Sequence, residues 1–496
     1  MKVPGEFEGI ERVHLMGIGG AGMSALALLL AGKGFAVEGC DLARSEYTVK
    51  IENLGIDCVV GHSPLHIEKF SPQLVVYSSA VDSNHEELLA ARRRGIRTAG
   101  RGLALSWLFN ASQGIGVAGT HGKTTTSSMV GLILESAGYA PTLAIGAEVC
   151  DIGVNARVGK SDFFVAEIDE SDGSFEFFKP AVTAITNVDW DHVNYFHTRE
   201  DVVSAFIRFA GARKPDTPLV VCAEDAGAQS LIGELKNDPK LVTCGWGKSW
   251  NWGAYDVARK EGGGVVFSVA CNGETLGKME LTISGDHNVM NALVACATAS
   301  SVGIPFETAA KTLREFRGAR RRLEKLGERD RVQVIDDYAH HPTEITASLS
   351  AMRDAYPGRR LVAIFQPHRY TRTSAFYREI ASALEAADIA LLLPIYAAGE
   401  SSQEITSEDI FNIMHADGHR SIFCSDENDA LARLDSLLGK DDVLITLGAG
   451  NVSQLGEAYL KRVSQLPQKC SLDYNATEFE ELEERVSELE DKAPRV

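Results

Sequence analysis

Short apolar runs alternate with helical patterns along most of the chain. In the first segment, apolar runs at 12–17, 37–41 and 74–79 predict strands, and the run 23–31 predicts a helix between the first two. Strands that alternate with helices are typical of a parallel sheet built from βαβ units. The pattern therefore predicts a Rossmann-like α/β domain over residues 1–112.

Two further segments repeat this alternation. The second, residues 113–318, contains apolar runs that predict a parallel sheet, and a glycine-rich, hairpin-like stretch at 259–270. The third, residues 319–470, predicts another Rossmann-like α/β unit. The strands expected in these two segments are 114–118, 163–167, 181–187, 331–336, 361–365, 389–393 and 443–447.

Residues 471–496 form an acidic tail rich in glutamate. Its apolar residues Phe479, Leu482, Val486 and Leu489 fall at helical spacing, but an isolated helix of this length is marginal in water. Two interpretations stay open: a frayed tail, or a short helix that docks on a partner or on the rest of the chain.

Composition agrees with several globular domains. A chain of 496 residues is too long for one core, and its 45% hydrophobic and 24% charged residues are typical of soluble proteins. The formal net charge of -19 argues against a nucleic-acid partner, because the phosphate backbone would be repelled. Small anionic ligands are not excluded, since a few arginines and lysines suffice to bind them.

Cysteine usage and the first residues indicate a cytoplasmic protein. The nine cysteines are scattered without a Cys-x-x-Cys pair, which is typical of reduced thiols. Residues 1–10 lack the pattern of a signal peptide, and no apolar run approaches the ~20 residues that a membrane span needs. A monomer and a homodimer are both compatible with the sequence.

A phosphate-binding loop follows the strand at 114–118. Its glycines can turn backbone N–H groups toward an oligophosphate at the start of a helix, and a lysine and hydroxyls follow them. The spacing departs from the common P-loop, because five residues instead of four separate Gly116 from Gly122. The sequence still predicts ATP binding, by Gly119, Thr120, His121, Gly122, Lys123, Thr124 and Thr125.

Acidic residues at the ends of the next two strands predict a Mg²⁺ site. Glu167 ends one strand and is expected to complete the site with the Thr124 hydroxyl. His192, beside Asp191, is a second candidate ligand. For Asp169, Glu170 and Asp172, a role as helix caps or solvated loop residues is equally open.

The first domain carries a dinucleotide fingerprint. Gly17, Gly19 and Gly22 have the G-x-G-x-x-G spacing, and Asp41 ends the following strand. Such a turn lets a diphosphate approach backbone amides, so it suits NAD, FAD or a nucleoside-diphosphate sugar. Because a separate ATP loop follows, the redox cofactor is the weaker interpretation.

Polar clusters at two strand ends mark the third domain. Tyr338 and His340 follow one strand, and Arg369 and Arg372 follow the next, spaced to fork onto a carboxylate or phosphate. Elsewhere, Asn288 and Asn291 offer groups that match an adenine edge, with a helix cap and an interior asparagine as the alternative. The basic triplet 320–322 is either a solvated face or a phosphate clamp at a hinge.

Together these motifs resemble the Mur ligase family, and within it the branch that adds L-alanine. The resemblance covers the chain to about residue 465, and the matching motifs follow one another in the same order as in the family. Its most specific elements are DDYAHHPTE and QPHRYTRT, which separate this branch from ligases that add later residues. The other matching stretches are GIGGAGMS, GTHGKTTT, EIDESDGSF, TNVDWDH and GDHNVMNAL.

The resemblance implies an ATP-dependent ligase with three domains. ATP would activate the lactyl carboxylate of UDP-N-acetylmuramate as an acyl phosphate, which the amine of L-alanine then attacks. It implies that Lys123, Glu167, His192 and Arg369 are catalytic, with one Mg²⁺ on Thr124 and Glu167 and a second on His192. It further implies ATP contacts from His287, Asn291 and Arg322, and substrate contacts from Gly17, Gly19, Gly20, Gly22, Asp41, His62, Tyr338, His340, Arg369 and Arg372.

Three alternatives remain. An NAD(P)- or flavin-dependent oxidoreductase would use the first glycine loop but leaves the phosphate loop and the third-domain clusters unexplained. A nucleotide-gated binding protein would use the acidic tail. Within the ligases, the enzyme that recycles murein tripeptide stays open.

Overall fold

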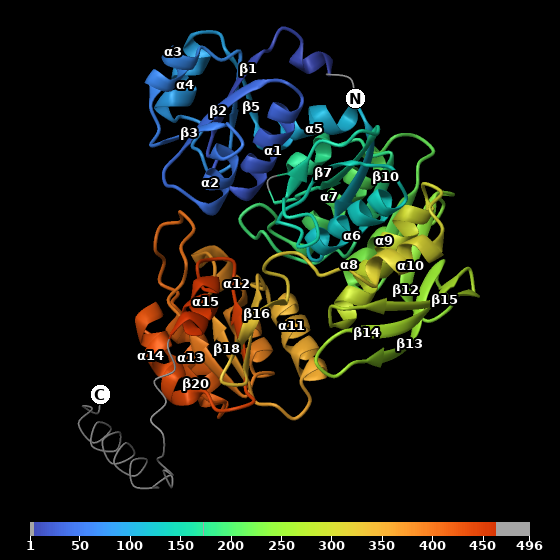
Figure 1. Cartoon of the computed structure of the whole chain (residues 1–496), viewed down its shortest axis with the longest axis vertical. Coiled ribbons are helices and arrows are strands. Elements are labelled where there is room, and N and C mark those ends of the chain that lie inside the picture. Colours follow the sequence, from blue (N-terminus) through green and yellow to red (C-terminus); the bar gives the residue numbers. More distant parts are fainter. Residues whose placement is uncertain (1–3, 172, 463–496) are drawn as a thin grey trace. The chain divides into compact units, whose positions relative to one another are not determined.

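The computed structural model describes residues 4–171 and 173–462. Residues 1–460 form one compact unit, whose strands build three sheets (Figure 1). The expected tail at 471–496 lies outside the described residues, as does the C-terminal end of the expected third domain. Within the described ranges, no helix combines the length and the apolar character that crossing a membrane requires.

The first sheet has five parallel strands in the order β3-β2-β1-β4-β5. Its strands are β1 Arg12–Met16, β2 Ala36–Asp41, β3 Asp57–Val60, β4 Leu74–Tyr77 and β5 Arg97–Gly100. The connecting elements are η1 Gly5–Phe7, α1 Ala21–Gly32, α2 Glu46–Glu52, α3 Pro64–Phe70, α4 Glu86–Arg93 and α5 Arg101–Asn110. The predicted Rossmann-like arrangement is confirmed, and the glycine loop follows β1, where the strand order reverses.

The second sheet has ten strands in the order β15-β14-β13-β12-β11-β10-β6-β9-β7-β8. The strands are β6 Gln113–Ala118, β7 Thr142–Ala144, β8 Ala156–Arg157, β9 Phe163–Glu167, β10 Val182–Ile185, β11 Leu219–Cys222, β12 Leu241–Trp246, β13 Trp252–Arg259, β14 Val265–Cys271 and β15 Glu274–Leu281. The helical elements are α6 Lys123–Ser136, η2 Ser174–Phe177, α7 Arg199–Ala212, α8 Ala226–Glu234, α9 Asp286–Ser300 and α10 Phe306–Leu313. Its middle is parallel as predicted, and the expected hairpin is β13 and β14.

The third sheet has six strands in the order β16-β17-β21-β18-β19-β20. The strands are β16 Glu324–Arg329, β17 Val332–Asp337, β18 Leu361–Phe365, β19 Ile389–Leu392, β20 Ser421–Phe423 and β21 Val443–Leu447. The helices are α11 Pro342–Ala355, α12 Tyr370–Leu384, α13 Ser407–Ala416, α14 Glu427–Leu437 and α15 Ser453–Lys461. The sequence did not predict β16, a polar strand that pairs antiparallel with β17 at the sheet edge.

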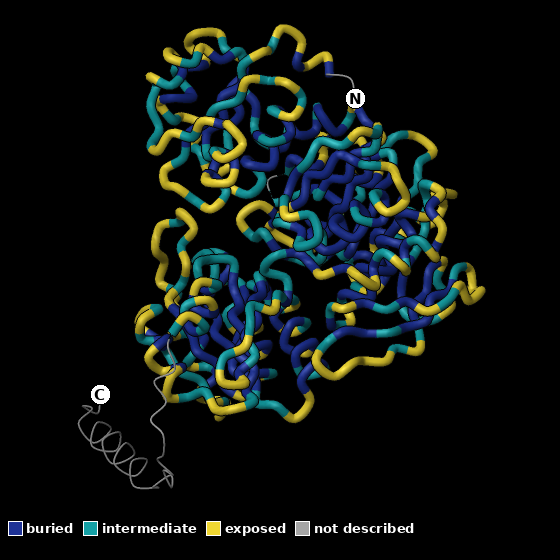
Figure 2. The backbone as a smooth tube through the Cα atoms, viewed as in Figure 1, coloured by how far each residue is buried: buried dark blue, intermediate teal, exposed yellow. Residues whose placement is uncertain are grey.

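The core follows the apolar pattern. Every residue of β18 and β21 is buried, as expected for strands covered by helices on both faces (Figure 2). The first sheet likewise has an apolar cluster on each face, one around α1 and α5 and a smaller one around α3 and α4. Each parallel sheet thereby presents the carboxyl ends of its strands as a polar edge, where ligands bind in such folds.

A short connector joins the second and third sheets. Its backbone is bonded to the second sheet's loops as far as Arg320, whose N–H donates to the Glu148 carbonyl at 2.9 Å. From Arg321 it is bonded to the third sheet, because the Arg321 carbonyl accepts the N–H of Tyr338 at 2.8 Å and the N–H of Leu323 donates to Asp337 Oδ2 at 2.7 Å. Arg321 and Leu323 both have the left-handed backbone conformation, with φ of 59° and 48°. The crossing between the two sheets is therefore only a few residues long.

Candidate active site

The phosphate loop joins β6 to α6 and requires glycine at two positions. Gly119 has φ of 131°, and a Cβ there would lie 2.1 Å from Thr186 Oγ1. Gly122 has φ of 79°, and a Cβ there would lie 2.4 Å from Asn291 Oδ1. The loop thus packs without side chains against its neighbours and leads directly into α6. The positive end of the α6 dipole lies at the loop, which favours a bound anion.

Lys123 is the first residue of α6, and its ammonium group folds back over the loop. Nζ donates to the Gly119 carbonyl at 2.6 Å and to the Thr120 carbonyl at 3.0 Å. It also pairs with Glu170 Oε2 at 2.9 Å. Burial alone would lower the pKa of Lys123, but the negative charges of Glu170, Asp169 and Glu167 raise it. Lys123 is therefore a fixed positive charge.

The predicted metal ligands Thr124 and Glu167 lie together. Thr124 Oγ1 donates to Glu167 Oε2 at 2.8 Å, and the N–H of Gly146 donates to the same oxygen at 2.8 Å. A hydroxyl and a carboxylate beside a phosphate loop are the oxygen donors that Mg²⁺ prefers. The residues present therefore fit the metal that the sequence predicted.

His192, the second predicted ligand, lies beside Glu170 and Asp169. The ligand atoms of these three residues lie within 4.8 Å of one another, and His192 Nε2 is 3.5 Å from Glu170 Oε1. Burial would raise the pKa of Asp169, but the charges of Lys123, Arg101 and His192 lower it to about 2. Glu170, for which the sequence left a capping role open, is instead a buried carboxylate between Lys123 and His192.

A buried ion pair connects this edge to the third sheet. Arg372, in the first turn of α12, donates from Nε to Asp191 Oδ1 at 2.9 Å and from Nη2 to Asp191 Oδ2 at 3.0 Å. Burial would raise the pKa of Asp191, but Arg372 and His192 hold it well below its usual range. The sequence predicted that the Arg372 guanidinium forks onto a ligand carboxylate or phosphate, whereas in this structure it forks onto Asp191 of the protein itself.

His121 of the phosphate loop makes a second connection. Its Nδ1 lies 3.2 Å from Glu344 Oε1, and its Nε2 lies 3.3 Å from Asp189 Oδ2. Glu344 is held by a capping box at the start of α11, where its other oxygen accepts the N–H of His341. Thr343 donates to Asp189 at 2.7 Å, which closes the group.

The residues predicted to contact ATP adjoin this junction. Arg322 Nη1 lies 3.9 Å from Glu344 Oε1, and burial lowers the pKa of nearby His287 to about 4. Asn291 is buried between two helices, where its Oδ1 accepts from Thr126 at 3.2 Å and its Nδ2 donates to Asn288 at 3.1 Å. In this structure the Asn291 amide therefore joins α6 to α9.

The remaining predicted residues of the third sheet lie near one another. His340 Nδ1 contacts the Tyr338 carbonyl at 2.8 Å, and the Tyr338 ring lies 5.0 Å from the Arg322 guanidinium carbon. Arg369 lies at the N-cap position of α12 with a positive φ of 68° and makes no side-chain capping hydrogen bond there. Burial lowers the pKa of His340 to about 4, so this ring is neutral near neutral pH. Between the two strand ends, the His340 ring lies 5.8 Å from the His368 ring, and His368 Nδ1 lies 3.4 Å from Arg372 Nη1.

In the first sheet, the fingerprint loop is held by its own acidic residue. The N–H of Gly19 donates to Asp41 Oδ2 at 2.8 Å, and the N–H of Gly17 donates to the Cys40 carbonyl at 2.8 Å. His62 Nδ1 lies 3.0 Å from Cys40 Sγ. Asp41 therefore orders the predicted substrate loop Gly17–Gly22, whereas His62 belongs to a separate cluster beneath it.

Arg101 connects the first sheet to the phosphate loop. Its Nη2 lies 3.4 Å from Asp169 Oδ2, and α1 meets the second sheet where Asn155 Nδ2 donates to the Ala21 carbonyl at 2.8 Å. All three sheets thus contribute charged groups to one region. Five carboxylates of this region were not among the predicted site residues: Asp169, Glu170, Asp189, Asp191 and Glu344.

Family profiles match most of the chain. The Mur ligase family catalytic domain matches residues 12–113, the Mur ligase middle domain matches residues 117–299, and the Mur ligase glutamate ligase domain matches residues 321–450. The three matches follow one another in the order of the three sheets.

Individual relatives resemble the chain over nearly its whole length. The UDP-N-acetylmuramate–L-alanine ligase of Geobacter sp. (strain M21) is 39% identical, over 92% of this chain and 98% of the relative. The crystal structure of UDP-N-acetylmuramate-alanine ligase from Thermotoga maritima superposes with a TM-score of 0.76 at 28% identity, covering 91% of this chain and 98% of that one. A murein peptide ligase from Psychrobacter arcticus has a TM-score of 0.69 at 24% identity, covering 93% and 100%, and therefore shows the shared fold alone.

The His121 contacts predict a pH-dependent contribution to stability. Burial alone would lower the pKa of His121, but the carboxylates of Glu344 and Asp189 raise it from 6.5 to about 9. Because the folded-state pKa is the higher one, the stabilisation is complete below pH 6.5 and is lost as the pH rises through about 9. The His121→Gln variant should therefore unfold at a lower temperature than the wild type at pH 6.5, with the difference shrinking by pH 9.

The exposed residue His415 provides the matched control, because His415→Gln should leave the melting curve close to wild type at every pH. A wild-type-to-His121→Gln difference that stays constant between pH 6.5 and 9 would contradict the assignment.

Proposed function

The chain belongs to the Mur ligase family, and from this we propose that it joins L-alanine to the lactyl carboxylate of UDP-N-acetylmuramate in an ATP-dependent step of peptidoglycan precursor synthesis. The observation that carries the proposal is the junction of the second and third sheets. There the phosphate loop and the expected amino-acid site are joined through His121–Glu344 and Asp191–Arg372. Use of ATP supports a cytoplasmic location.

We assign the three domains to residues 1–112, 113–318 and 319–470. Each of the three sheets lies within one of these ranges, which supports the assignment. The first domain binds the UDP part of the substrate at the loop Gly17–Gly22, with Asp41 ordering the loop. The second binds MgATP, and the third binds the amino acid.

The phosphate loop and Lys123 position the ATP phosphates. Mg²⁺ would be held by Thr124 and Glu167, and a second ion by His192, where the metal neutralises charge on phosphate oxygens. Lys123 carries a permanent positive charge, so it stabilises the negative charge that spreads over the transferred phosphoryl group. Glu170, which pairs with Lys123, keeps that ammonium group oriented beside the loop.

The reaction then proceeds in two steps. The lactyl carboxylate oxygen attacks the γ-phosphorus of ATP, and the bond between that phosphorus and the β,γ-bridging oxygen breaks. ADP departs as the leaving group, and the carboxylate has become an acyl phosphate. The amine of L-alanine attacks the acyl carbon, and the tetrahedral intermediate expels phosphate while the nitrogen loses a proton. The protein's contribution is to hold mutually repelling anions in position and to exclude water from the acyl phosphate.

The third-sheet cluster is assigned to the amino acid. Arg369, at the N-cap position of α12, would recognise the alanine carboxylate, and His340 and Tyr338, whose rings lie 5.4 Å apart, would complete that pocket. Arg372 is bonded to Asp191 and holds the cluster against the second sheet, so its role is positioning. Selection among alanine, serine and glycine rests on pocket contacts worth only ~1–3 kcal/mol.

The first test is substrate dependence. Phosphate release should require both UDP-N-acetylmuramate and L-alanine, and the tripeptide L-Ala-γ-D-Glu-meso-diaminopimelate should not replace L-alanine. Turnover with the tripeptide in preference to L-alanine would assign the recycling reaction instead. Phosphate release from ATP in the absence of both UDP-N-acetylmuramate and L-alanine would favour a nucleotide-gated binding protein.

Lys123→Ala should abolish turnover, because the loop loses the charge that stabilises the transferred phosphoryl group, while the first domain still binds the UDP sugar. Lys236→Ala, at an exposed residue after α8, is the matched control and should retain wild-type rates. Phosphate release and UDP-sugar binding by calorimetry measure the two effects. Normal turnover by Lys123→Ala would refute the assignment of the phosphate loop.

Glu167→Gln should raise the Mg²⁺ concentration needed for half-maximal turnover, because an amide replaces a carboxylate in the donor set. A magnesium titration of the phosphate-release rate measures this shift. Glu234→Gln, at an exposed residue, should leave the magnesium dependence unchanged. An unchanged dependence in Glu167→Gln would remove this residue from the metal site.

A further inference from the structure

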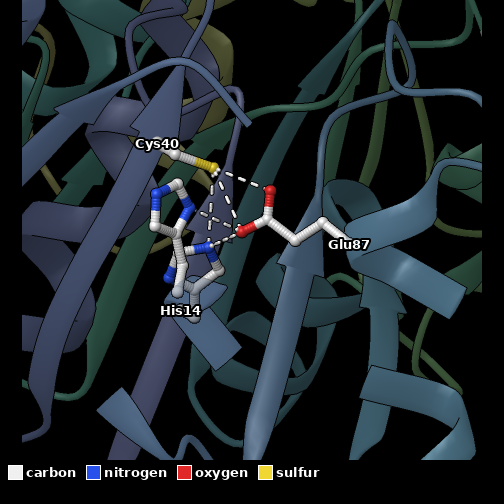
Figure 3. A group of neighbouring side chains, drawn as sticks. His14, Cys40 and Glu87 are labelled. Carbon is white, nitrogen blue, oxygen red and sulfur yellow. Dashed lines mark hydrogen bonds and ion pairs between the residues drawn. The ribbon is translucent and has the colours of Figure 1, made fainter. Parts of the chain in front are cut away.

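A group of metal-binding side chains lies in the first domain, apart from the ATP site. The His14 cluster consists of His14 on β1, Cys40 on β2, His66 on α3 and Glu87 on α4, whose ligand atoms all lie within 4.8 Å of one another. The Cys40 sulfur and the Glu87 carboxylate point toward one another and toward the His14 ring (Figure 3). No step of the proposed reaction uses these side chains.

The spacing of the ligand atoms is close to that of a tetrahedral zinc site. Cys40 Sγ lies 3.5 Å from His14 Nε2 and 3.5 Å from Glu87 Oε2. Glu87 Oε1 lies 2.9 Å from His14 Nε2 and 2.9 Å from His66 Nδ1. Zinc bond lengths place ligand atoms about 3.3–3.6 Å apart, so an outward shift of about half an ångström is enough to admit the ion.

Outer contacts hold the ligands in orientation. His14 Nδ1 lies 3.0 Å from Glu38 Oε1, so in the metal-bound form Nδ1–H would donate a hydrogen bond to Glu38 and leave Nε2 to ligate the ion. Such carboxylate–histidine pairs are a regular feature of zinc sites. The N–H of Ser63 donates to Glu87 Oε2 at 3.1 Å, which turns Oε1 toward both histidines. His62 Nδ1 lies 3.0 Å from Cys40 Sγ and 3.5 Å from Glu87 Oε2, so it contacts two of the four side chains of the cluster.

Charge and burial favour a divalent cation. His14, Cys40 and Glu87 are each 0% exposed, and Cys40 packs in the apolar cluster between the sheet and the helices α3 and α4. A buried carboxylate is costly unless positive charge compensates it, and in this structure His14 and His66 each lie 2.9 Å from Glu87 Oε1 in that role, which a metal ion would take over. One divalent ion with one thiolate, one carboxylate and two neutral imidazoles has no net charge. The sulfur and nitrogen donors select Zn²⁺ over Mg²⁺.

We propose that the His14 cluster binds one Zn²⁺ as a structural site of the first domain. The ion would connect two strands to two helices. Cys40 immediately precedes Asp41, which accepts the N–H of Gly19, so the ion would also fix the strand end that orders the glycine loop. The site is independent of the ATP chemistry.

Co²⁺ titration of the chelator-treated, full-length protein tests the site. One equivalent should produce a thiolate-to-cobalt charge-transfer band with intense tetrahedral d–d bands, and Zn²⁺ should bleach both. Cobalt bound to the oxygen donors near Thr124 gives no thiolate band, so the two sites are distinguished. Zn²⁺ should also raise the melting temperature of the metal-free protein.

Variants locate the site. Cys40→Ser should lose the charge-transfer band, and Cys58→Ser is the matched control, because Cys58 lies on β3 opposite Gly39, outside the cluster. Glu38→Gln should retain the band but weaken cobalt binding about 10–100-fold. His66→Ala, at a partly exposed residue, should weaken binding further while circular dichroism shows a folded protein.

Folded wild-type protein that shows no charge-transfer band would overturn the proposal and leave the cluster as a hydrogen-bonded charge network. A band that persists in Cys40→Ser, or that disappears in Cys58→Ser, would also overturn it.

Discussion

The buried pair of Asp191 and Arg372 is the interaction on which the junction of the second and third sheets depends. Both side chains are almost inaccessible to solvent and form two hydrogen bonds of 2.9 and 3.0 Å. Separating the two sheets would leave the Asp191 and Arg372 charges without their partners. Breaking a buried ion pair costs far more free energy than breaking one at the surface. His121 adds a second connection at this junction, because its ring contacts the carboxylates of Asp189 and Glu344. The side chains assigned to ATP and to the amino acid therefore lie at one joined polar edge.

Much of this architecture could be predicted from the chain, because strand ends of parallel sheets gather on one edge. The apolar runs located the strands β6, β9, β18 and β21, and the phosphate loop after β6 led to Thr124 and Glu167, which do lie together. The polar edge strand β16 was missed, since none of its residues is buried and it therefore has no apolar run. Glu344 could not be assigned from the local pattern either, because its partner His121 is 223 residues away in the sequence. Its position at the start of α11 also matches that of an ordinary capping residue.

The charges around the phosphate loop explain how one site accommodates both anions and cations. Glu167, Asp169 and Glu170 approach a single lysine, and the positive charges of Lys123, Arg101 and His192 keep Asp169 ionised. Each carboxylate is held by a hydrogen bond or ion pair from a fixed element, so little reorganisation is needed when charge is transferred. Such preorganisation is expected where catalysis consists mainly of positioning.

The connector between the second and third sheets has a kinetic consequence. It passes from the second sheet to the third between Arg320, bonded to Glu148, and Leu323, bonded to Asp337, and within this segment the carbonyl of Arg321 accepts the N–H of Tyr338. Three residues span at most about 10 Å, so the two halves of the junction stay tethered at high effective concentration even when their ion pairs open. Reassembly of the junction is therefore a first-order event, whose rate does not depend on how much of the enzyme a cell contains.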